Sequence, residues 1–447
     1  EDGRYVINGM RSGGPYKVEI SCLGYQTVIN TGITLQLGEP YALNSVVNDD
    51  KQMLSEAVVV AQAASRFAGE KTGAATNISS KQMDALPNIS RSLEDVSKLS
   101  PYGGNGMNFA GGDGRSSNFT VDGANFNNNF GLNEGLPGGG NPISIDAIEE
   151  MQVVIAPYDV RQTNFIGGGM NAITKSGTNQ FKGSAYTYHK NEWMRGNTNY
   201  LGEEFGNRNK ERMTTYGFTL GGPIIKLFFF VNFERSQSPT EVNLWRASVD
   251  GVADADHYIS RTTEADMEAV KKHLMDNYGY DAGSYTDYPA QETNTKVLAR
   301  IDWNINDNHH LAVRYNYTLN QSWTATNRSS GNMVRRASGD RLSQYGMAFA
   351  NSIYSTDNLV HSFAFDLNSR FSNNLSNQLL VTFSKLDDVR GSSSDKFPFI
   401  DILHAGDYAA GKIMPYISAG YELFTWNNGV HNTVINAKDD ITYFVGN

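Results

Sequence analysis

The sequence predicts an all-β-dominated fold: a transmembrane β-barrel with an internal α+β plug, preceded by an N-terminal β-sandwich fragment. Three observations lead to this prediction. Apolar and polar residues alternate along strand-length segments after residue 178, the links between these segments are alternately long and short, and 38 of the 50 aromatic residues lie at positions 181–447. A soluble all-β protein explains the alternation alone but not the alternating link lengths, which are typical of outer-membrane barrels.

Length and composition exclude several classes of protein. The 447 residues suffice for about three domains of ~100–200 residues. The net charge is −10 and no Lys/Arg run is dense, so we expect no nucleic-acid partner. Cys22 is the single cysteine, which excludes an internal disulfide and a thiolate metal cluster. The longest apolar run, 227–231, is too short for a transmembrane helix.

Residues 1–53 have the pattern of a small β-domain. Tyr16, Val18 and Ile20 alternate with polar residues, and the turns at 13–15 and 38–40 are rich in glycine and proline. Short strands separated by such turns predict the C-terminal part of a β-sandwich. The first residues lack the basic region and apolar core of a secretory signal, so we expect that the chain starts within this domain.

Residues 178–447 are expected to form the N-terminal part of the barrel. A nine-residue strand tilted by ~40° covers roughly 23 Å, close to the ~25 Å apolar band of an outer-membrane barrel. One face of the pattern is polar and includes Arg300, Asp302, Arg314 and Asn316, so we expect a polar contact with the plug. The expected strands are 181–189, 214–224, 227–235, 296–305, 311–319, 359–371, 377–385 and 430–445.

Two details do not fit this pattern simply. Residues 345–354 also resemble a strand, and we place them within an outer loop because a further crossing would break the alternation of link lengths. Lys226 runs directly into Leu227 without turn residues, which suggests that one or two residues are missing from this hairpin.

Residues 61–177 predict a domain of their own. The segment has 12 glycines between Gly103 and Gly140 and is rich in asparagine. Helices are expected at 80–86 and 92–99, and strands at 119–122 and 148–155. A folded segment of this size has a radius of gyration near 13 Å. It does not fit inside an eight-stranded barrel, so we expect about 22 strands in the complete barrel and about eight in this chain.

Several motifs identify a family by resemblance. The sequence Leu-Ser-Glu-Ala-Val-Val-Val at 54–60, the segments 78–87 and 91–95, and Phe-Thr-Val-Asp-Gly at 119–123 resemble the segment entering the plug of TonB-dependent outer-membrane receptors. The last plug strands of the Oar-like branch are similar to 145–154, 156–162 and 167–179, and its first barrel hairpin is similar to 221–230. Residues 1–53 resemble the carboxypeptidase-regulatory-like domain of Bacteroidetes receptors.

This resemblance implies a transporter of the Gram-negative outer membrane that takes up a peptide, protein or glycan with energy transmitted by TonB. It implies no enzymatic activity and no cofactor. The expected partners are the periplasmic C-terminal domain of TonB, outer-membrane lipids, an extracellular ligand and a surface lipoprotein. Two alternatives stay open: a structural or adhesive outer-membrane barrel with a static plug, and a secreted β-rich binding protein.

Two segments are candidate binding sites. By the resemblance, residues 54–60 contact TonB through β-augmentation, which their β-branched run suits; the equal alternative is the last strand of the N-terminal sandwich. Amides of the Gly-rich plug loops offer donors and acceptors to a ligand; the alternative is a flexible connector. The candidate TonB contacts are Leu54, Ser55, Glu56, Ala57, Val58, Val59 and Val60, and the candidate ligand contacts are Asn105, Asn108, Asn125, Asn127, Asn128 and Asn129.

The sequence predicts neither a catalytic nor a metal site. His309 and His310 are neighbours, so on a strand they point to opposite faces and do not share a metal. The glycines at 167–169 precede Lys175 in the wrong order for a phosphate-binding loop. Residues 264–278 predict an amphipathic helix within a long outer loop, which either covers a ligand vestibule or packs on the loop.

Overall fold

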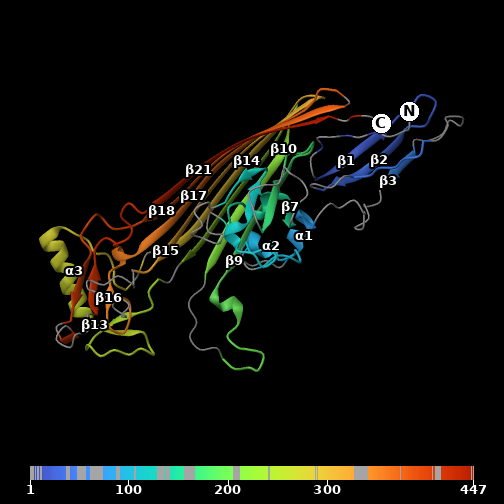
Figure 1. Cartoon of the computed structure of the whole chain (residues 1–447). Helices are drawn as coiled ribbons and strands as arrows, with labels where there is room; N and C mark the ends of the chain where they lie inside the picture. The colour runs from blue at the N-terminus through green and yellow to red at the C-terminus, as the bar shows by residue number, and fades with distance from the viewer. Residues whose placement is uncertain are drawn as a thin grey trace.

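A computed structural model gives the fold. It describes the chain except residues 1–4, 6, 8, 9, 11, 12, 37–40, 48–56, 61–73, 87–90, 105, 106, 128–135, 137–140, 156–166, 205–211, 240, 241, 287, 289, 327–340, 373, 405, 408–413, 444, 446 and 447. A long sheet crosses the molecule diagonally, with the plug on one side, a loop cluster at one end and a small N-terminal sheet at the other (Figure 1).

The long sheet has eight antiparallel strands in the order β21-β18-β17-β15-β14-β11-β10-β9. All eight expected strands are present. Each expected strand lies within the observed strand or ends within one residue of it. The exception is the last strand, which was expected to reach residue 445, whereas β21 ends at Tyr443. Their bounds are β9 (Lys182–Lys190), β10 (Met213–Ile224), β11 (Leu227–Pro239), β14 (Gln291–Asn306), β15 (His309–Thr324), β17 (Tyr354–Arg370), β18 (Leu375–Gly391) and β21 (Gly429–Tyr443).

Short hairpins join these strands at one end, which is the end near the N-terminal sheet (Figure 1). The hairpin after β10 is closed by Ile225 and Lys226, because Ile224 pairs directly with Leu227. Ile225 has φ of 56°, a conformation that a β-branched residue rarely adopts. The connection expected to lack residues is therefore a tight turn with backbone strain.

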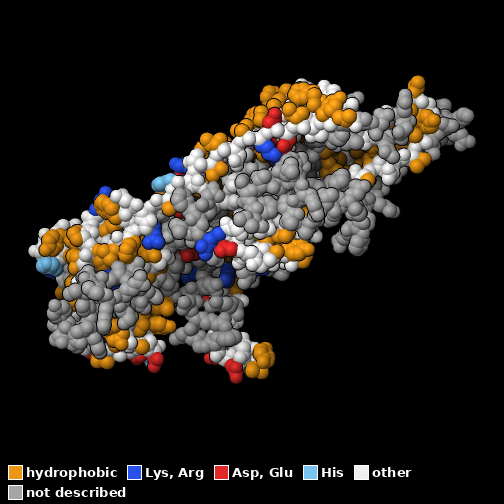
Figure 2. Space-filling model, in the orientation of Figure 1, with side chains coloured by type: hydrophobic (Ala, Val, Ile, Leu, Met, Phe, Trp, Pro, Cys, Tyr) orange, Lys and Arg blue, Asp and Glu red, His pale blue; other side chains and the backbone are white. Residues whose placement is uncertain are grey.

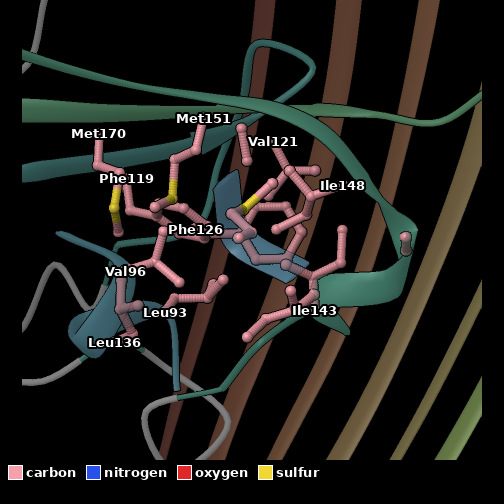
Figure 3. Close-up of a cluster of buried hydrophobic side chains, with 14 of the residues drawn as sticks. Leu93, Val96, Phe119, Val121, Phe126, Leu136, Ile143, Ile148, Met151 and Met170 are labelled. Carbon is pink, nitrogen blue, oxygen red and sulfur yellow. The ribbon is translucent and has the colours of Figure 1, made fainter. Parts of the chain in front are cut away.

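The plug contains a five-stranded sheet in the order β4-β7-β8-β5-β6. The expected helices and strands are confirmed as α1 (Ser80–Ala85), α2 (Leu93–Ser97), β5 (Asn118–Val121) and β7 (Ile148–Ile155), joined by β4 (Ala74–Ser79), β6 (Ala124–Asn125) and β8 (Gly168–Thr174). Leu93 and Val96 of α2 pack on Phe119, Phe126 and Met151 (Figure 3). The same core includes Phe230, Leu298, Val360 and Leu386 of the long sheet, so plug and sheet share buried apolar contacts.

Three of the four long links at the other end, those after β11, β15 and β18, fold together into a cap. One link supplies β12 (Arg246–Ser248), β13 (Ile259–Thr263) and α3 (Glu264–Tyr278), the second supplies β16 (Met347–Ala348), and the third supplies β19 (Ile400–Leu403) and β20 (Pro415–Ala419). β16, β20 and β19 form one sheet. The helix expected at 264–278 is present with these bounds as α3, and it packs on the cap through Met267 and Leu274. Residues 345–354 lie in the second of these links, as expected, up to Tyr354, where β17 begins.

A three-stranded sheet stands where the sequence predicts the sandwich fragment, with the order β1 (Gly13–Ile20), β2 (Val28–Leu35) and β3 (Ala57–Val60). None of the described helices has the length and apolar character needed to cross a membrane.

Candidate functional site at the contact between plug and sheet

A buried carboxylate on β11 is the centre of the first polar contact between plug and sheet. Glu234 is 3% exposed. Its Oε1 accepts a hydrogen bond from Lys296 Nζ at 2.9 Å, and its Oε2 accepts from Ser144 Oγ and Tyr186 OH, each at 2.9 Å. Arg91 Nη2 donates to the same Oε2 at 3.1 Å. Ser144 and Arg91 belong to the plug, whereas the other three residues belong to the sheet.

Arg91 is held from several sides. It forms a second ion pair with Asp146 of the plug. Its guanidinium lies 5.1 Å from the ring centre of Tyr186 and 4.6 Å from that of Tyr188, both on β9. A planar guanidinium suits this position because it can stack on aromatic rings and donate in its own plane.

The second polar contact is built on Asp122, in the turn between β5 and β6. Within the plug, Asp122 accepts hydrogen bonds from Thr174 N at 2.9 Å and from Thr174 Oγ1 at 2.6 Å. From the sheet, Arg300 Nη1 and Arg314 Nε each lie 3.3 Å from Asp122 Oδ2. Arg300 also donates to Thr174 Oγ1 at 2.6 Å and is paired with Asp302 at 3.1 Å.

The same turn requires glycine at its second position. Gly123 has φ of 78°, and a Cβ added there would lie 2.5 Å from Leu380 Cδ2 on β18. The Asp-Gly pair thus serves two purposes: the left-handed backbone closes the β5–β6 turn, and the missing side chain lets the turn lie directly against the sheet.

A third contact involves the plug backbone. The carbonyl oxygen of Pro142 accepts hydrogen bonds from Thr318 Oγ1 at 2.6 Å and from Asn316 Nδ2 at 3.3 Å, both on β15. Asn316 Oδ1, Asn232 Oδ1 and Arg314 Nη1 are buried here without a hydrogen-bond partner among the described residues. Buried polar atoms of this kind commonly bind water, so the contact is polar and suited to hydration.

Taken together, the plug meets the sheet through ion pairs and hydrogen bonds as well as a few apolar side chains. The expected polar face is confirmed, because Arg300, Arg314 and Asn316 all face the plug and are at most 5% exposed. Arg91, Asp122 and Glu234 were not predicted as contacts between plug and sheet. The Asp-Gly pair at the end of the predicted strand 119–122 was the available signal for Asp122. Arg91 begins one of the family motifs, but nothing in the sequence pairs it with Glu234, which is far away in the chain.

The structure places part of the predicted TonB segment. Ala57 to Val60 form β3, which pairs in parallel with residues 28–31 of β2. This is the alternative position, as the last strand of the N-terminal domain. Leu54, Ser55 and Glu56 lie outside the described residues, and TonB contact stays a prediction.

The predicted ligand-binding asparagines are partly used inside the plug. Asn125 is 6% exposed, and its Oδ1 accepts from Asn127 N at 2.7 Å. Asn127 donates to Asn118 Oδ1 at 2.6 Å and accepts from Phe119 N at 2.7 Å. Asn108 is half-buried. Asn105, Asn128 and Asn129 lie outside the described residues, and ligand contact by this region also stays a prediction.

The cap is held together by Arg261 of β13. Its Nε donates to the carbonyl oxygen of Tyr345 at 2.9 Å, and its Nη1 donates to Asp407 Oδ1 at 3.1 Å. These partners come from the second and third outer links, so one side chain joins all three. Tyr416 adds a further cross-link, because its hydroxyl donates to Asp266 Oδ2 at 2.7 Å.

Hydrogen bonds from Tyr416 and Thr263 hold the pKa of Asp266 below its usual value. Asp266 therefore remains ionised at the first turn of α3, where a negative charge is favoured. Within the described part of the chain, no group of three or more His, Cys, Asp or Glu side chains is arranged to bind a metal ion.

Comparisons with known proteins agree with this architecture. A sequence model of the family described as "Outer membrane beta barrel domain" matches residues 173–447. The TonB-dependent transporter Oar of Myxococcus xanthus is 27% identical over 242 residues, which are 51% of this chain and 21% of that protein.

A solved structure shares the fold. The outer membrane transporter YddB of Escherichia coli matches with a TM-score of 0.51 and 13% identity, over 84% of this chain and 46% of that chain. The siderophore receptor PirA of Pseudomonas aeruginosa matches with a TM-score of 0.44 and 12% identity, over 72% of this chain and 42% of that chain. The chain thus spans less than half the length of each of these relatives.

Proposed function

Because the chain belongs to the outer membrane β-barrel domain family, we propose that the protein is a TonB-dependent transporter that takes up a peptide, protein or glycan across the Gram-negative outer membrane. The name of the Myxococcus xanthus relative and the plug seated against the sheet support this proposal. The proposed work is transport without covalent chemistry, with the plug as the moving part.

The polar contact between plug and sheet is the observation that carries the proposal. A plug held mainly by apolar packing would expose a large apolar surface on moving. Here Glu234 and Asp122 bind their partners through charges and hydrogen bonds, which water can replace when the plug shifts. The buried polar atoms beside these pairs that lack a hydrogen-bond partner among the described residues favour a hydrated contact.

Force is proposed to enter at residues 54–60, which lie just before the plug. TonB would add a strand to this segment and pull on the chain leading to β4. The free edge of β3 fits this role, because β3 is at the end of its three-stranded sheet and pairs with β2 alone among the described strands. A surface lipoprotein and outer-membrane lipids are the other proposed partners.

The test measures binding of the purified periplasmic domain of TonB to the detergent-extracted protein. Val59→Pro removes a backbone donor from the segment, so we expect binding to be lost. Val252→Pro in the cap is the matched control and should bind like the wild type. Unchanged binding by Val59→Pro would overturn the proposed coupling segment.

A second measurement separates the transporter from a structural or adhesive barrel. Hydrogen exchange of residues 74–175 is compared with and without the TonB domain. A transporter predicts faster exchange in the plug when TonB is bound, whereas a static plug predicts no change.

A further inference from the structure

The face of the long sheet turned away from the plug is apolar along most of its length. Its side chains are exposed, as illustrated by Ile301 at 50%, Val313 at 38% and Phe363 at 48%. The neighbouring positions Arg300 and Arg314 face the plug and are at most 5% exposed. The away face is therefore the one that contacts lipid in a barrel of this family.

A basic belt follows this apolar surface at the end of the sheet that carries the cap. Side chains two residues apart on a strand share a face. On each of three strands, a basic side chain lies on the same face as a phenylalanine and two residues closer to the cap: Arg235 beyond Phe233 on β11, His361 beyond Phe363 on β17, and Lys385 beyond Phe383 on β18. On β21, the residues Ile435, Thr433 and His431 share this face, and His431 is the one nearest the cap. We define the basic belt as Arg235, His361, Lys385 and His431. Blue and pale-blue side chains are visible on the rim of the sheet between the hydrophobic surface and the cap (Figure 2).

Neighbouring side chains hold the belt in place. His361 and Lys385 are cross-strand partners. His361 Nδ1 lies 2.9 Å from Tyr315 OH, and its ring centre lies 5.3 Å from that of Tyr317. Tyrosines are typical of the boundary between hydrocarbon and headgroups, so they place the belt at that boundary.

One carboxylate lies within the belt. Asp387 Oδ2 is 3.3 Å from Lys385 Nζ, and Asp387 Oδ1 is 2.7 Å from His431 Nδ1. The Asp387 side chain is 11% exposed, whereas those of Lys385 and His431 are 48% and 65% exposed. The carboxylate thus lies beneath the two nitrogen groups and leaves them facing outward. Lys385 has three N–H donors, of which one suffices for Asp387.

Arg235 lies on the same outward face. Its Nη1 donates to Thr295 Oγ1 at 3.4 Å, whereas its Nε is buried and is not available to a headgroup. A charge on the lipid face is much less costly at the edge of the hydrocarbon than at its centre. Basic groups at that edge attract anionic headgroups, with about a fivefold gain in affinity for each Lys or Arg.

We propose that the basic belt binds the phosphate groups of lipids in the outer leaflet, with Lys385 and His361 forming one contact and Arg235 another. The cap end of the sheet faces away from the N-terminal sheet and its predicted TonB segment, so the phosphates belong to the leaflet on the cell surface. The phosphate contact rests on the outward face of the sheet, and only the choice of leaflet rests on the proposed function.

The test uses the protein extracted from outer membranes and placed in phosphatidylcholine nanodiscs that contain either phosphorylated lipid A or its dephosphorylated form. Native mass spectrometry measures the lipid A retained. We expect retention of the phosphorylated form alone, reduced about fivefold by Lys385→Gln and about twenty-fivefold by the Arg235→Gln/Lys385→Gln double variant.

Lys438→Gln is the matched control, because Lys438 lies on β21 opposite Leu380, on the plug side of the sheet, and is paired with Asp440 at 2.8 Å. It should retain phosphorylated lipid A like the wild type. Heat-dependent migration in electrophoresis checks that each variant is folded. Equal retention of both lipid forms, equal loss in the control, or displacement of lipid A by inorganic phosphate alone would each overturn the proposal.

Discussion

Arg91 Nη2 of the plug lies 3.1 Å from Glu234 Oε2 of the sheet, although 143 residues separate the two in the chain. The pair is buried and shares its carboxylate with Lys296. Such a pair contributes little net stability compared with apolar packing, but loss of one partner leaves the other charge buried and unbalanced. It therefore positions the plug more than it strengthens the fold.

Glu234→Gln is expected to loosen the plug strongly. Arg91 and Lys296 would keep their charges without the shared carboxylate, which should cost about 3–5 kcal/mol in the free energy that holds the plug in place. Hydrogen exchange of the β7 amides measures this loss. The control is Asp95→Asn, which removes an exposed pair with Lys98 at 2.8 Å and should cost less than ~1 kcal/mol. Similar effects of the two variants would contradict the argument.

Gly123→Ala is expected to hinder docking of the β5–β6 turn. The new Cβ would meet Leu380, and the positive φ adds strain, so we expect a loss of about 2–5 kcal/mol in unfolding free energy. Gly111→Ala has a similar φ of 79° with no atom within 4 Å, so it should show only the backbone cost of ~1–2 kcal/mol. Urea unfolding of both variants gives the difference, which vanishes if the turn does not lie against β18.

Ile225→Gly is expected to stabilise the β10–β11 hairpin. Ile225 is 95% exposed, so its side chain contributes little packing, and glycine removes a left-handed strain of ~1–2 kcal/mol. Slower hydrogen exchange at the hairpin would show the gain. Lys226→Gly is the comparison: Lys226 has no positive φ, and glycine there should destabilise by ~0.5–1 kcal/mol. A destabilised Ile225→Gly variant would refute the strain.

The cap should loosen in acid through Asp266. Its pKa is lower in the folded cap than in the unfolded chain because Tyr416 and Thr263 donate hydrogen bonds to the ionised form. This contribution to stability is complete above the ordinary pKa of Asp and is lost as pH falls through the folded value. Hydrogen exchange of α3 measured from neutral pH to about pH 2.5 should show a loss of protection below ~pH 4.

Asp266→Asn isolates this group from other carboxylates in the cap. It should show weaker protection of α3 at neutral pH and a smaller further loss in acid. Identical pH profiles for the variant and the wild type would assign the acid sensitivity to another group.

Local patterns were sufficient for the eight strands of the long sheet and for the helix of the cap, but not for the short strands of the cap. Residues 264–278 form the expected helix because its apolar positions recur at helical spacing, Thr263 caps its start and Gly279 ends it with φ of 64°. The expected strands are confirmed, because lipid-facing and plug-facing side chains alternate along each of them, as Val313 and Arg314 do. The strands extend beyond the expected bounds at the cap end, where the outward residues become polar and the alternation loses contrast.

By itself, the sequence determined which residues of each strand face lipid and which face the plug, and it predicted that the plug contact is polar. Only the tertiary structure decided that Glu234 meets Arg91, that Asp122 meets Arg300 and Arg314, and that three outer links join through Arg261. The physical reason is that alternation depends on neighbours along one strand, whereas these contacts depend on strand register and on where the plug sits. Those are set by the packing of segments that are distant in the chain.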